Sequence, residues 1–446
     1  MKKRNNPYHY AVVCCAMVIS SGALRAQAPM KLPLNEAISM SLQNSGQMKI
    51  ANEKVNEAHA NYHEATNNRL PDIKVSGAYL RLNAPNLDLK IKTGNTTQEA
   101  GQSTNAAPKV EQAAYGLVNA SLPLFSGLRI KNGITAAAQM EKAARFDAEK
   151  DREEIVRSTI VAYSNLFKAQ RSVALVRENL VREEKRVTDF RNLEKNGLLP
   201  RNELLKAQLQ QSNIELALLE AESNQKMASI NLALALGLPE GTLIMPDSNG
   251  MDYPADAGTI DQWESLALEN RKDRAALAAR TNAATASLKA TKGEYYPGIA
   301  LTGGYIAADV PNLLTLTNAL NVGIGLQYNI GSLWKTGAKA DAVKARLHQL
   351  QASEGILADR VRLEINNAYQ QYLLSIKKIS VFAKSVEQAT ENYRITKNKY
   401  DNNLVTTTEL LDADVAQLQA TLNYTFSKTD AMVAYKNLQL TAGIMK

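Results

Sequence analysis

Apolar residues recur every seven positions along a stretch of the chain that contains neither glycine nor proline. The stretch runs from residue 134 to residue 196 and permits one continuous helix about 95 Å long, at 1.5 Å per residue. Its apolar positions form two interleaved series, Leu166, Val173, Leu180 and Val187 in one and Ile155, Ala162, Ala169, Val176 and Phe190 in the other. Sustained seven-residue spacing is typical of helices that pack along their length. We therefore predict a long helix with a coiled-coil packing face.

The placement of proline and glycine predicts the remaining helices, because both residues interrupt helical structure. A second long stretch, residues 338–402, is interrupted only by Gly355. Four shorter helical windows lie near residues 34–70, 201–236, 261–295 and 406–441. We expect each long helix to be followed by a short one that packs antiparallel to it.

Four further windows alternate apolar with small or polar residues, which is the period of a β-strand with two different faces. The predicted strands span about residues 72–82, 113–124, 298–307 and 320–330. About ten residues suffice for a tilted strand to cross a bilayer; a soluble sheet buried on one face is the alternative. Residues 83–112 are rich in Asn, Gly, Gln, Ser and Thr and are expected to form a long exposed loop.

The chain contains a tandem duplication. At an offset of 206 residues, Leu198 matches Leu404, Gly237 matches Gly443, and Glu203-Leu204-Leu205 matches Glu409-Leu410-Leu411. We assign the first repeat to residues 29–241, a linker to 242–260 and the second repeat to 261–446. Each repeat is expected to contain a helix, two strands, a long helix and a shorter helix.

Four strands are too few to close a barrel, and an open sheet in lipid leaves backbone groups unpaired at its edges. We therefore expect copies of the chain to pool their strands, and three copies give twelve. The long helices would then form a hollow cylinder that continues the barrel into an aqueous compartment. The predicted fold class is mainly helical with a membrane β-barrel contribution, and the predicted function is a conduit.

The first 28 residues have the three parts of an export signal. They comprise a basic start, an apolar stretch over residues 11–19, and small residues ending in Ala26-Gln27-Ala28. A lipid anchor at Cys14 or Cys15 is an alternative, disfavoured because only three apolar residues precede these cysteines. Cleavage would remove both cysteines, so we expect a mature chain without thiol or disulfide chemistry.

Composition favours a folded chain with no nucleic-acid partner. Hydrophobic residues make up 45% and charged residues 22%. The formal charge of +8 falls to +4 when the four basic residues of the signal are removed, namely Lys2, Lys3, Arg4 and Arg25. The basic run from Arg182 to Arg186 also contains Glu183 and Glu184, which favours a solvated helix face over a phosphate-binding patch.

Motifs for catalysis or metal binding are missing from the sequence. His59 and His63 share a helix face, but Ala60 stands where a zinc protease carries a glutamate. We interpret this pair as part of a polar helix face. We expect no catalytic residue, no metal site and no cofactor.

The turns between long and short helices carry the most informative polar residues. The predicted tips lie at residues 195–203 and 400–409. Gly197 and Asn403 stand where a left-handed residue ends a helix, and Pro200 and residues 406–408 favour the start of the next helix. Both turns are therefore predicted to be tips of helix hairpins.

Taken together, these features resemble the TolC family of outer-membrane efflux and secretion channels. The resemblance rests on the export signal, the duplicated halves, the motif Leu122-Pro123-Leu124-Phe125-Ser126-Gly127 and the paired tips, and it covers essentially the whole mature chain. It implies a homotrimer with a twelve-stranded barrel in the outer-membrane lipid and a helical tunnel in the periplasm. It also implies docking to a periplasmic adaptor (membrane fusion protein) and an inner-membrane pump.

Matched positions in the family imply roles for individual residues. Glu409 and Asp412 fall where acidic residues line the closed tunnel entrance, and threefold symmetry would make each a ring that favours cations. The alternative is that they are ordinary acidic residues at a helix start, where the helix dipole favours them. Tyr400 and Glu203 fall where a hydrogen bond between hairpins holds the entrance shut.

The resemblance also implies that the tips dock the adaptor, through Gly197, Leu198, Asn403 and Leu404. The sequence departs from the family at Asn403, which replaces the usual glycine, and at Val405, where some members carry an arginine that stabilises the gate. A periplasmic adaptor built from long helical hairpins is the rival interpretation, but it should carry a single hairpin. Small-molecule efflux and type I protein secretion use the same channel class, and the sequence does not separate them.

Overall fold

The computed structural model describes residues 30–83, 110–247, 252–311 and 313–445. The predicted signal, residues 1–28, and nearly all of the predicted loop 83–112 lie outside these residues. Two compact units are present. We call the unit drawn from Met1–Met48, Arg152–Trp263 and Ile365–Lys446 the hairpin unit, and the unit drawn from Lys49–Asp151 and Glu264–Glu364 the sheet unit.

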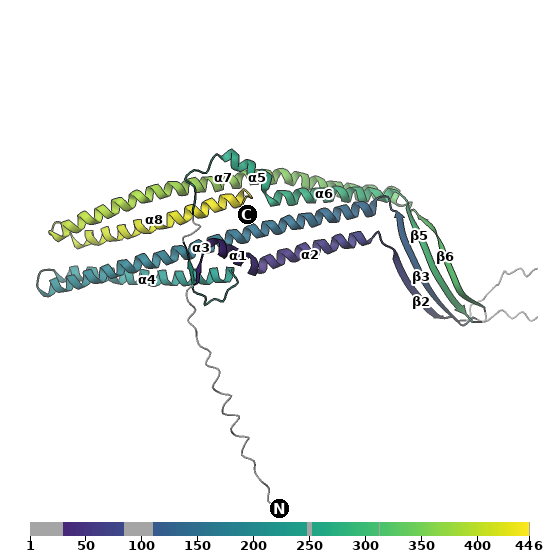
Figure 1. The fold of residues 1–446 in the computed structure, drawn as a ribbon, viewed down its shortest axis with the longest axis horizontal. Helices are drawn as coiled ribbons and strands as arrows, with labels where there is room; N and C mark the ends of the chain where they lie inside the picture. Colours follow the sequence, from purple (N-terminus) through teal and green to yellow (C-terminus); the bar gives the residue numbers. More distant parts are fainter. Residues whose placement is uncertain (1–29, 84–109, 248–251, 312, 446) are drawn as a thin grey trace, which may run out of the picture. The chain divides into compact units, whose positions relative to one another are not determined.

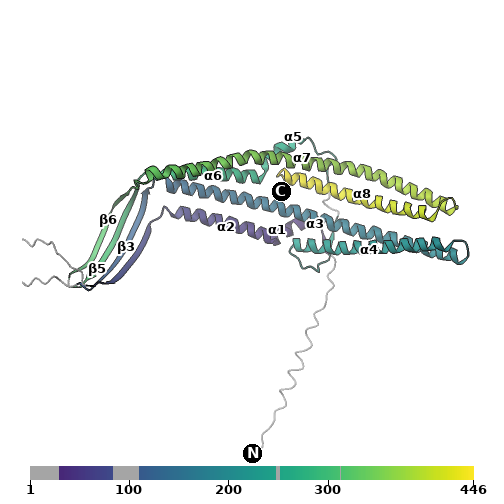
Figure 2. The same ribbon diagram turned by 180° about the vertical axis from the view of Figure 1, so that it is seen from behind.

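The hairpin unit is built from two antiparallel helix pairs. The long helices α3 (Arg129–Lys195) and α7 (Ser332–Asp401) contribute their C-terminal parts, and α4 (Arg201–Ala235) and α8 (Thr407–Thr441) return beside them. Figure 1 shows each pair as a hairpin with a short tip, and Figure 2 shows the same pairs from behind. The helix α1 (Leu34–Asn44) and a parallel pair of short strands, β1 (Met30–Leu32) and β4 (Ile244–Pro246), complete the unit.

The sheet unit contains an antiparallel sheet of four strands in the order β2-β3-β5-β6. These strands are β2 (Asp72–Arg81), β3 (Gln112–Phe125), β5 (Gly298–Val310) and β6 (Leu314–Gln327). The helices of this unit are most of α2 (Gly46–Asn67), the C-terminal part of α5 (Ile260–Asn270), α6 (Lys272–Lys292) with a 3-10 turn over Gly293–Tyr295, and the N-terminal parts of α3 and α7. Within the described residues, no helix has both the length and the apolar character needed to cross a membrane.

The ends of the short helices repeat one backbone pattern. Gly237 and Gly443 adopt left-handed conformations, with φ of 68° and 70°. The next amide donates to the carbonyl five residues back, over 2.8 Å from Leu238 and 3.1 Å from Ile444. The offset of 206 residues found in the sequence is therefore repeated in the backbone.

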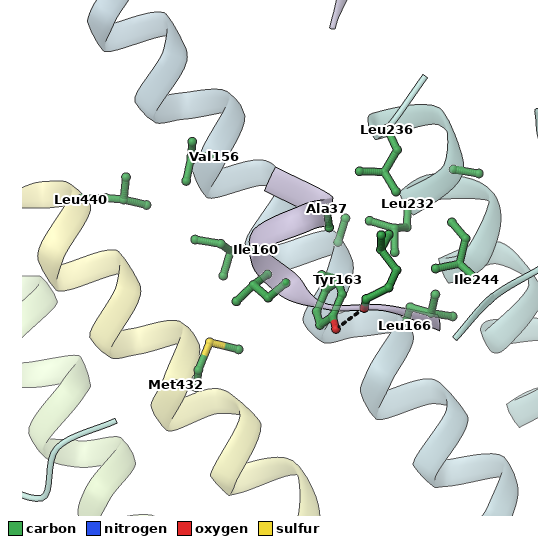
Figure 3. Close-up of a cluster of buried hydrophobic side chains, with 14 residues drawn as sticks. Ala37, Val156, Ile160, Tyr163, Leu166, Leu232, Leu236, Ile244, Met432 and Leu440 are labelled. Carbon is green, nitrogen blue, oxygen red and sulfur yellow. Dashed lines mark hydrogen bonds between the residues drawn. The ribbon is translucent and has the colours of Figure 1, made fainter. Parts of the chain in front are cut away.

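The core of the hairpin unit lies where α3 crosses α1 and the paired strands (Figure 3). The Tyr163 ring is fully buried, and its hydroxyl donates to the Leu32 carbonyl at 2.7 Å. Burial raises the pKa of Tyr163 to about 12. At the matching position, the Tyr369 hydroxyl donates to the Gly258 carbonyl at 2.9 Å. In both repeats a tyrosine of the long helix thus holds the chain just before a shorter helix, α1 in the first repeat and α5 in the second.

The packing face predicted on α3 is present. Seven of its nine apolar positions are buried, and Leu180 and Ala169 are half-buried. The equivalent face of α7 is less covered, since Tyr372 is buried while Ile379, Val386 and Tyr393 are half-buried. A single chain therefore covers its first packing face more fully than its second.

Several boundaries differ from the prediction. The windows 34–70 and 261–295 are each split into two helices, at Ser45 and at Arg271, where the backbone is extended. The Ser45 hydroxyl accepts from the amides of Gln47 and Met48, so it caps the second helix of that pair. The assigned linker, residues 242–260, contains strand β4.

The fourth strand also differs from its predicted range of 320–330. It begins six residues earlier, at Leu314, and ends at Gln327. The amide of Gly331 donates to the Asn329 side chain at 3.0 Å. This local turn ends the alternation, although Tyr328 and Ile330 continue the apolar pattern.

Candidate functional site at the helix hairpin tips

Both hairpin tips are built on the same backbone turn. Gly197 and Asn403 adopt left-handed conformations, with φ of 70° and 60°. The amide of the following leucine, Leu198 or Leu404, donates to the carbonyl five residues back at 2.9 Å. This pattern satisfies the last carbonyls of a helix. Asn403 keeps the turn without a glycine because asparagine tolerates this conformation.

Each turn projects one leucine into solvent. Leu198 and Leu404 are both 73% exposed. Two large apolar side chains at matched positions lie outside the core of this chain, so the tips offer an apolar contact to another molecule. Their role in docking an adaptor stays a prediction.

A buried arginine joins the two hairpins. Arg186 of α3 donates through Nη1 to Glu183 at 2.6 Å, and through Nη2 to Asp414 of α8 at 3.0 Å and to the Tyr393 hydroxyl of α7 at 3.1 Å. The three charged side chains are 10% exposed or less. We call these four residues the Arg186 cluster. Because its members come from α3, α7 and α8, the cluster ties the first hairpin to both helices of the second.

The Arg186 cluster contains two carboxylates and one guanidinium. Burial raises the pKa of Glu183 to about 7, against the opposing effect of the Arg186 charge, and Asp414 raises this pKa further. The Glu183 Oε1 atom is buried and has no hydrogen-bond partner. With Glu183 protonated, Arg186 and Asp414 form a balanced pair. Near neutral pH, Glu183 therefore gains or loses a proton, and the net charge of the cluster changes by one unit.

The Arg186 cluster was not predicted from the sequence. The interpretation of residues 182–186 as a solvated face is wrong for Glu183 and Arg186, although Arg182, Glu184 and Lys185 are exposed. A signal was available, because Glu183 stands seven residues from both Val176 and Phe190 and so occupies a position of the packing face. The partners on α7 and α8 lie more than 200 residues away and leave no such signal.

A smaller apolar contact lies between the Arg186 cluster and the tips. The Phe190 ring of α3 stacks on Tyr400 of α7, with ring centres 5.8 Å apart and an interplanar angle of 21°. Leu199 and Tyr400 pack against a buried group formed by Val187, Phe190, Leu204 and Ala207. Apolar packing and the ion cluster thus hold the same two hairpins together.

Thr407 of α8 lies beside both residues of the predicted gate hydrogen bond. Its hydroxyl donates to the Tyr400 hydroxyl at 3.3 Å. Thr407, followed by Lys206, holds the pKa of the Glu203 carboxyl below its usual range through polar interaction with it. Lys206 lies 3.0 Å from the Glu203 carboxylate. The structure thus places Tyr400 and Glu203 around Thr407; a direct bond between them stays a prediction.

The two acidic residues assigned to the entrance are exposed on the first turns of α8. Glu409 closes a capping box with Thr406: its amide donates to the Thr406 hydroxyl at 3.3 Å, and its carboxylate accepts from the Thr406 amide at 3.2 Å. Asp412 is exposed one turn later, while Leu410 and Leu411 are buried. Glu409 therefore helps to cap the start of α8, and its membership of an acidic ring stays a prediction.

Comparison with known proteins finds a family whose model matches both repeats of the chain. The family model described as "Outer membrane efflux protein" matches residues 37–238 and 263–443. The outer membrane efflux protein BepC of Brucella suis is 23% identical over 81% of this chain and 74% of its own length. The alkaline protease secretion protein AprF of Pseudomonas aeruginosa is 21% identical over 81% of this chain and 77% of its own length.

Solved structures share the fold. The outer membrane protein VceC of Vibrio cholerae has a TM-score of 0.74 at 17% identity, covering 92% of this chain and 96% of that protein. The open state of the Neisseria gonorrhoeae MtrE channel has a TM-score of 0.71 at 17% identity, covering 93% of this chain and 89% of that protein. The duplicated helices and the four strands therefore form an established architecture.

Proposed function

This chain belongs to the outer membrane efflux protein family and is an outer-membrane channel with a periplasmic helical part, and we propose that three copies of it form one conduit. The hairpin tips close this conduit at its periplasmic end. The rival interpretation as a periplasmic adaptor loses its support, since the family match covers both repeats.

The strands support a barrel shared among copies. In the described part of the chain, β2 and β6 are the outer strands of the sheet. Four apolar side chains on one face of β6 are 72–76% exposed, namely Leu320, Val322, Ile324 and Leu326. An apolar face of this kind is expected to contact lipid. Pairing β6 of one copy with β2 of the next gives hydrogen-bond partners to the backbone groups at both edges of the sheet. Three copies give twelve strands.

The helices support the same assembly. On α4, exposed leucines recur at the spacing of one helix face, at Leu205, Leu209, Leu216 and Leu219. A neighbouring copy that packs against this face removes it from water. The half-buried packing face of α7 likewise indicates that a neighbouring copy packs against the second hairpin.

In the closed channel, the Arg186 cluster and the Phe190–Tyr400 contact hold the two hairpins together. Widening the entrance requires the second hairpin to move away from the first, and these contacts resist that movement. The observation that carries the proposal is the bond from Arg186 to Asp414, since it spans both hairpins and is shielded from water. Acidic side chains at Glu409 and Asp412 then give the entrance a preference for cations.

Family members work with adaptor proteins and inner-membrane pumps. We assign the docking of an adaptor to Leu198 and Leu404, held outward by the turns at Gly197 and Asn403. The pump supplies the energy, so this chain needs no catalytic residue and no cofactor, and transport through it is passive.

The native mass of the protein, extracted by detergent from a separated outer-membrane fraction, tests the proposal. We expect three copies per particle, and single channels of low conductance after insertion into a planar bilayer. A monomer recovered from the soluble periplasmic fraction would overturn the shared barrel.

A further inference from the structure

Two histidines of α2 point their ring nitrogens at each other. The Nε2 atoms of His59 and His63 are 2.9 Å apart, and the two rings meet edge to face with centres 4.4 Å apart. They stand four residues apart, so they lie on the same helix face. Two imidazole nitrogens that converge from one helix face are a recurrent arrangement for binding a transition metal.

A glutamate of another helix fixes the orientation of the first ring. The Nδ1 atom of His59 lies 3.1 Å from Oε1 of Glu141 on α3. Arg145 pairs with the same oxygen at 2.6 Å, so this carboxylate is an acceptor. In the neutral ring, Nδ1 of His59 therefore carries the proton, which leaves a lone pair on Nε2, the atom 2.9 Å from His63. Metal-binding histidines are usually oriented by such a carboxylate on the other ring nitrogen.

We propose that His59 and His63 form a two-histidine site for a divalent late transition metal ion such as Cu²⁺, Ni²⁺ or Zn²⁺. The ion takes the place of the proton shared between the Nε2 atoms, and that proton moves to Nδ1 of His63. No electron is transferred. With metal–nitrogen bonds of about 2.1 Å at a tetrahedral angle, the two nitrogens stand about 3.4 Å apart. The two Nε2 atoms, now 2.9 Å apart, need to separate by about half an ångström.

Water completes the coordination in this proposal. Among the described residues, no group of three or more His, Cys, Asp or Glu side chains is arranged to hold a metal ion. The pair lines an open cleft of about 980 Å³ between α2 and the start of β2, which Glu64 and Asp72 also line. The cleft admits solvent to the free coordination positions, and its carboxylates make it favourable for a cation.

Metal titration of the purified channel, carried out without a polyhistidine tag, tests the site. Cu²⁺ and Zn²⁺ are added after chelator treatment, and binding is followed by calorimetry and, for Cu²⁺, by electron paramagnetic resonance. We expect one ion per chain, with nitrogen hyperfine structure from two imidazoles. His59→Ala and His63→Ala should each weaken binding more than tenfold. Glu141→Leu should weaken it by about 10- to 100-fold, as loss of an orienting carboxylate does.

His348→Gln is the matched control, because this exposed histidine of α7 belongs to the same unit and lies outside the pair. It should bind like the unaltered protein. Unchanged stoichiometry and affinity in His63→Ala, or equal loss in His348→Gln, would overturn the site. Thermal melting without metal identifies a variant that is misfolded, and Glu141→Leu then gives an independent test that leaves both histidines in place.

Discussion

The Arg186 guanidinium of α3 donates to the Asp414 carboxylate of α8 over 3.0 Å, across 228 residues of sequence. Removing one member of a buried ion cluster leaves the others unpaired, which costs about 3–5 kcal/mol. We therefore expect Arg186→Ala to lower the free energy of unfolding by that amount and to raise basal conductance in planar bilayers, because the hairpins separate more easily.

Arg182→Ala is the matched control for this prediction. Arg182 lies one turn earlier on α3 and is exposed, so its loss should change stability by less than about 0.5 kcal/mol. A triple variant, Arg186→Met with Glu183→Gln and Asp414→Asn, should recover part of the lost stability, since no buried charge is left unpaired. Equal effects of Arg186→Ala and Arg182→Ala would contradict a role for the cluster.

Stability should depend on pH through Glu183. Its pKa in the folded chain is about 7, above the ordinary value of 4.5, so between these values the folded chain holds a proton that the unfolded chain has lost. The stabilising contribution of Glu183 to the free energy of unfolding is fully present below pH 4.5 and is lost as pH rises to 7, a change of about 3 kcal/mol. Thermal unfolding at several pH values should show this slope, and Glu183→Gln should remove it. If stability changes with pH to the same extent in Glu183→Gln, another titrating group causes the dependence.

The repeated architecture was accessible from sequence because it depends on local signals. Gly197 and Asn403 both adopt the left-handed conformation that their places after a helix predict. The break at Arg271 was missed since no glycine or proline marks it, whereas the break at Ser45 had a signal in Gly46 that the predicted window 34–70 passed over. The Arg186 cluster and the contact of His59 with Glu141 were missed for a different reason: their partners lie far apart in sequence, and packing alone brings them together.

The acidic residues at the entrance are tested by removing charge while retaining shape. Glu409→Gln with Asp412→Asn keeps the capping box, because glutamine also serves at this position. We expect a lower preference for cations over anions and weaker block by divalent cations in planar bilayers, as fixed charge at a constriction sets both. Glu387→Gln, an exposed change on α7 away from the tip, is the control. Equal selectivity in the double variant and the control would show that these carboxylates do not line the narrowest point.

The tip leucines offer a test of docking that leaves the channel itself intact. Leu198→Asp with Leu404→Asp places a charge on each apolar contact. Because both side chains are 73% exposed, the change should alter stability by less than about 0.5 kcal/mol. Burying an unpaired charge against a partner is costly, so export in cells should fall while the native mass and the single-channel conductance stay unchanged. The conservative pair Leu198→Ile with Leu404→Ile should keep export near normal. Full export by the aspartate variant would place the docking surface elsewhere on the hairpins, and loss of the native mass would show instead that the tips hold the assembly together.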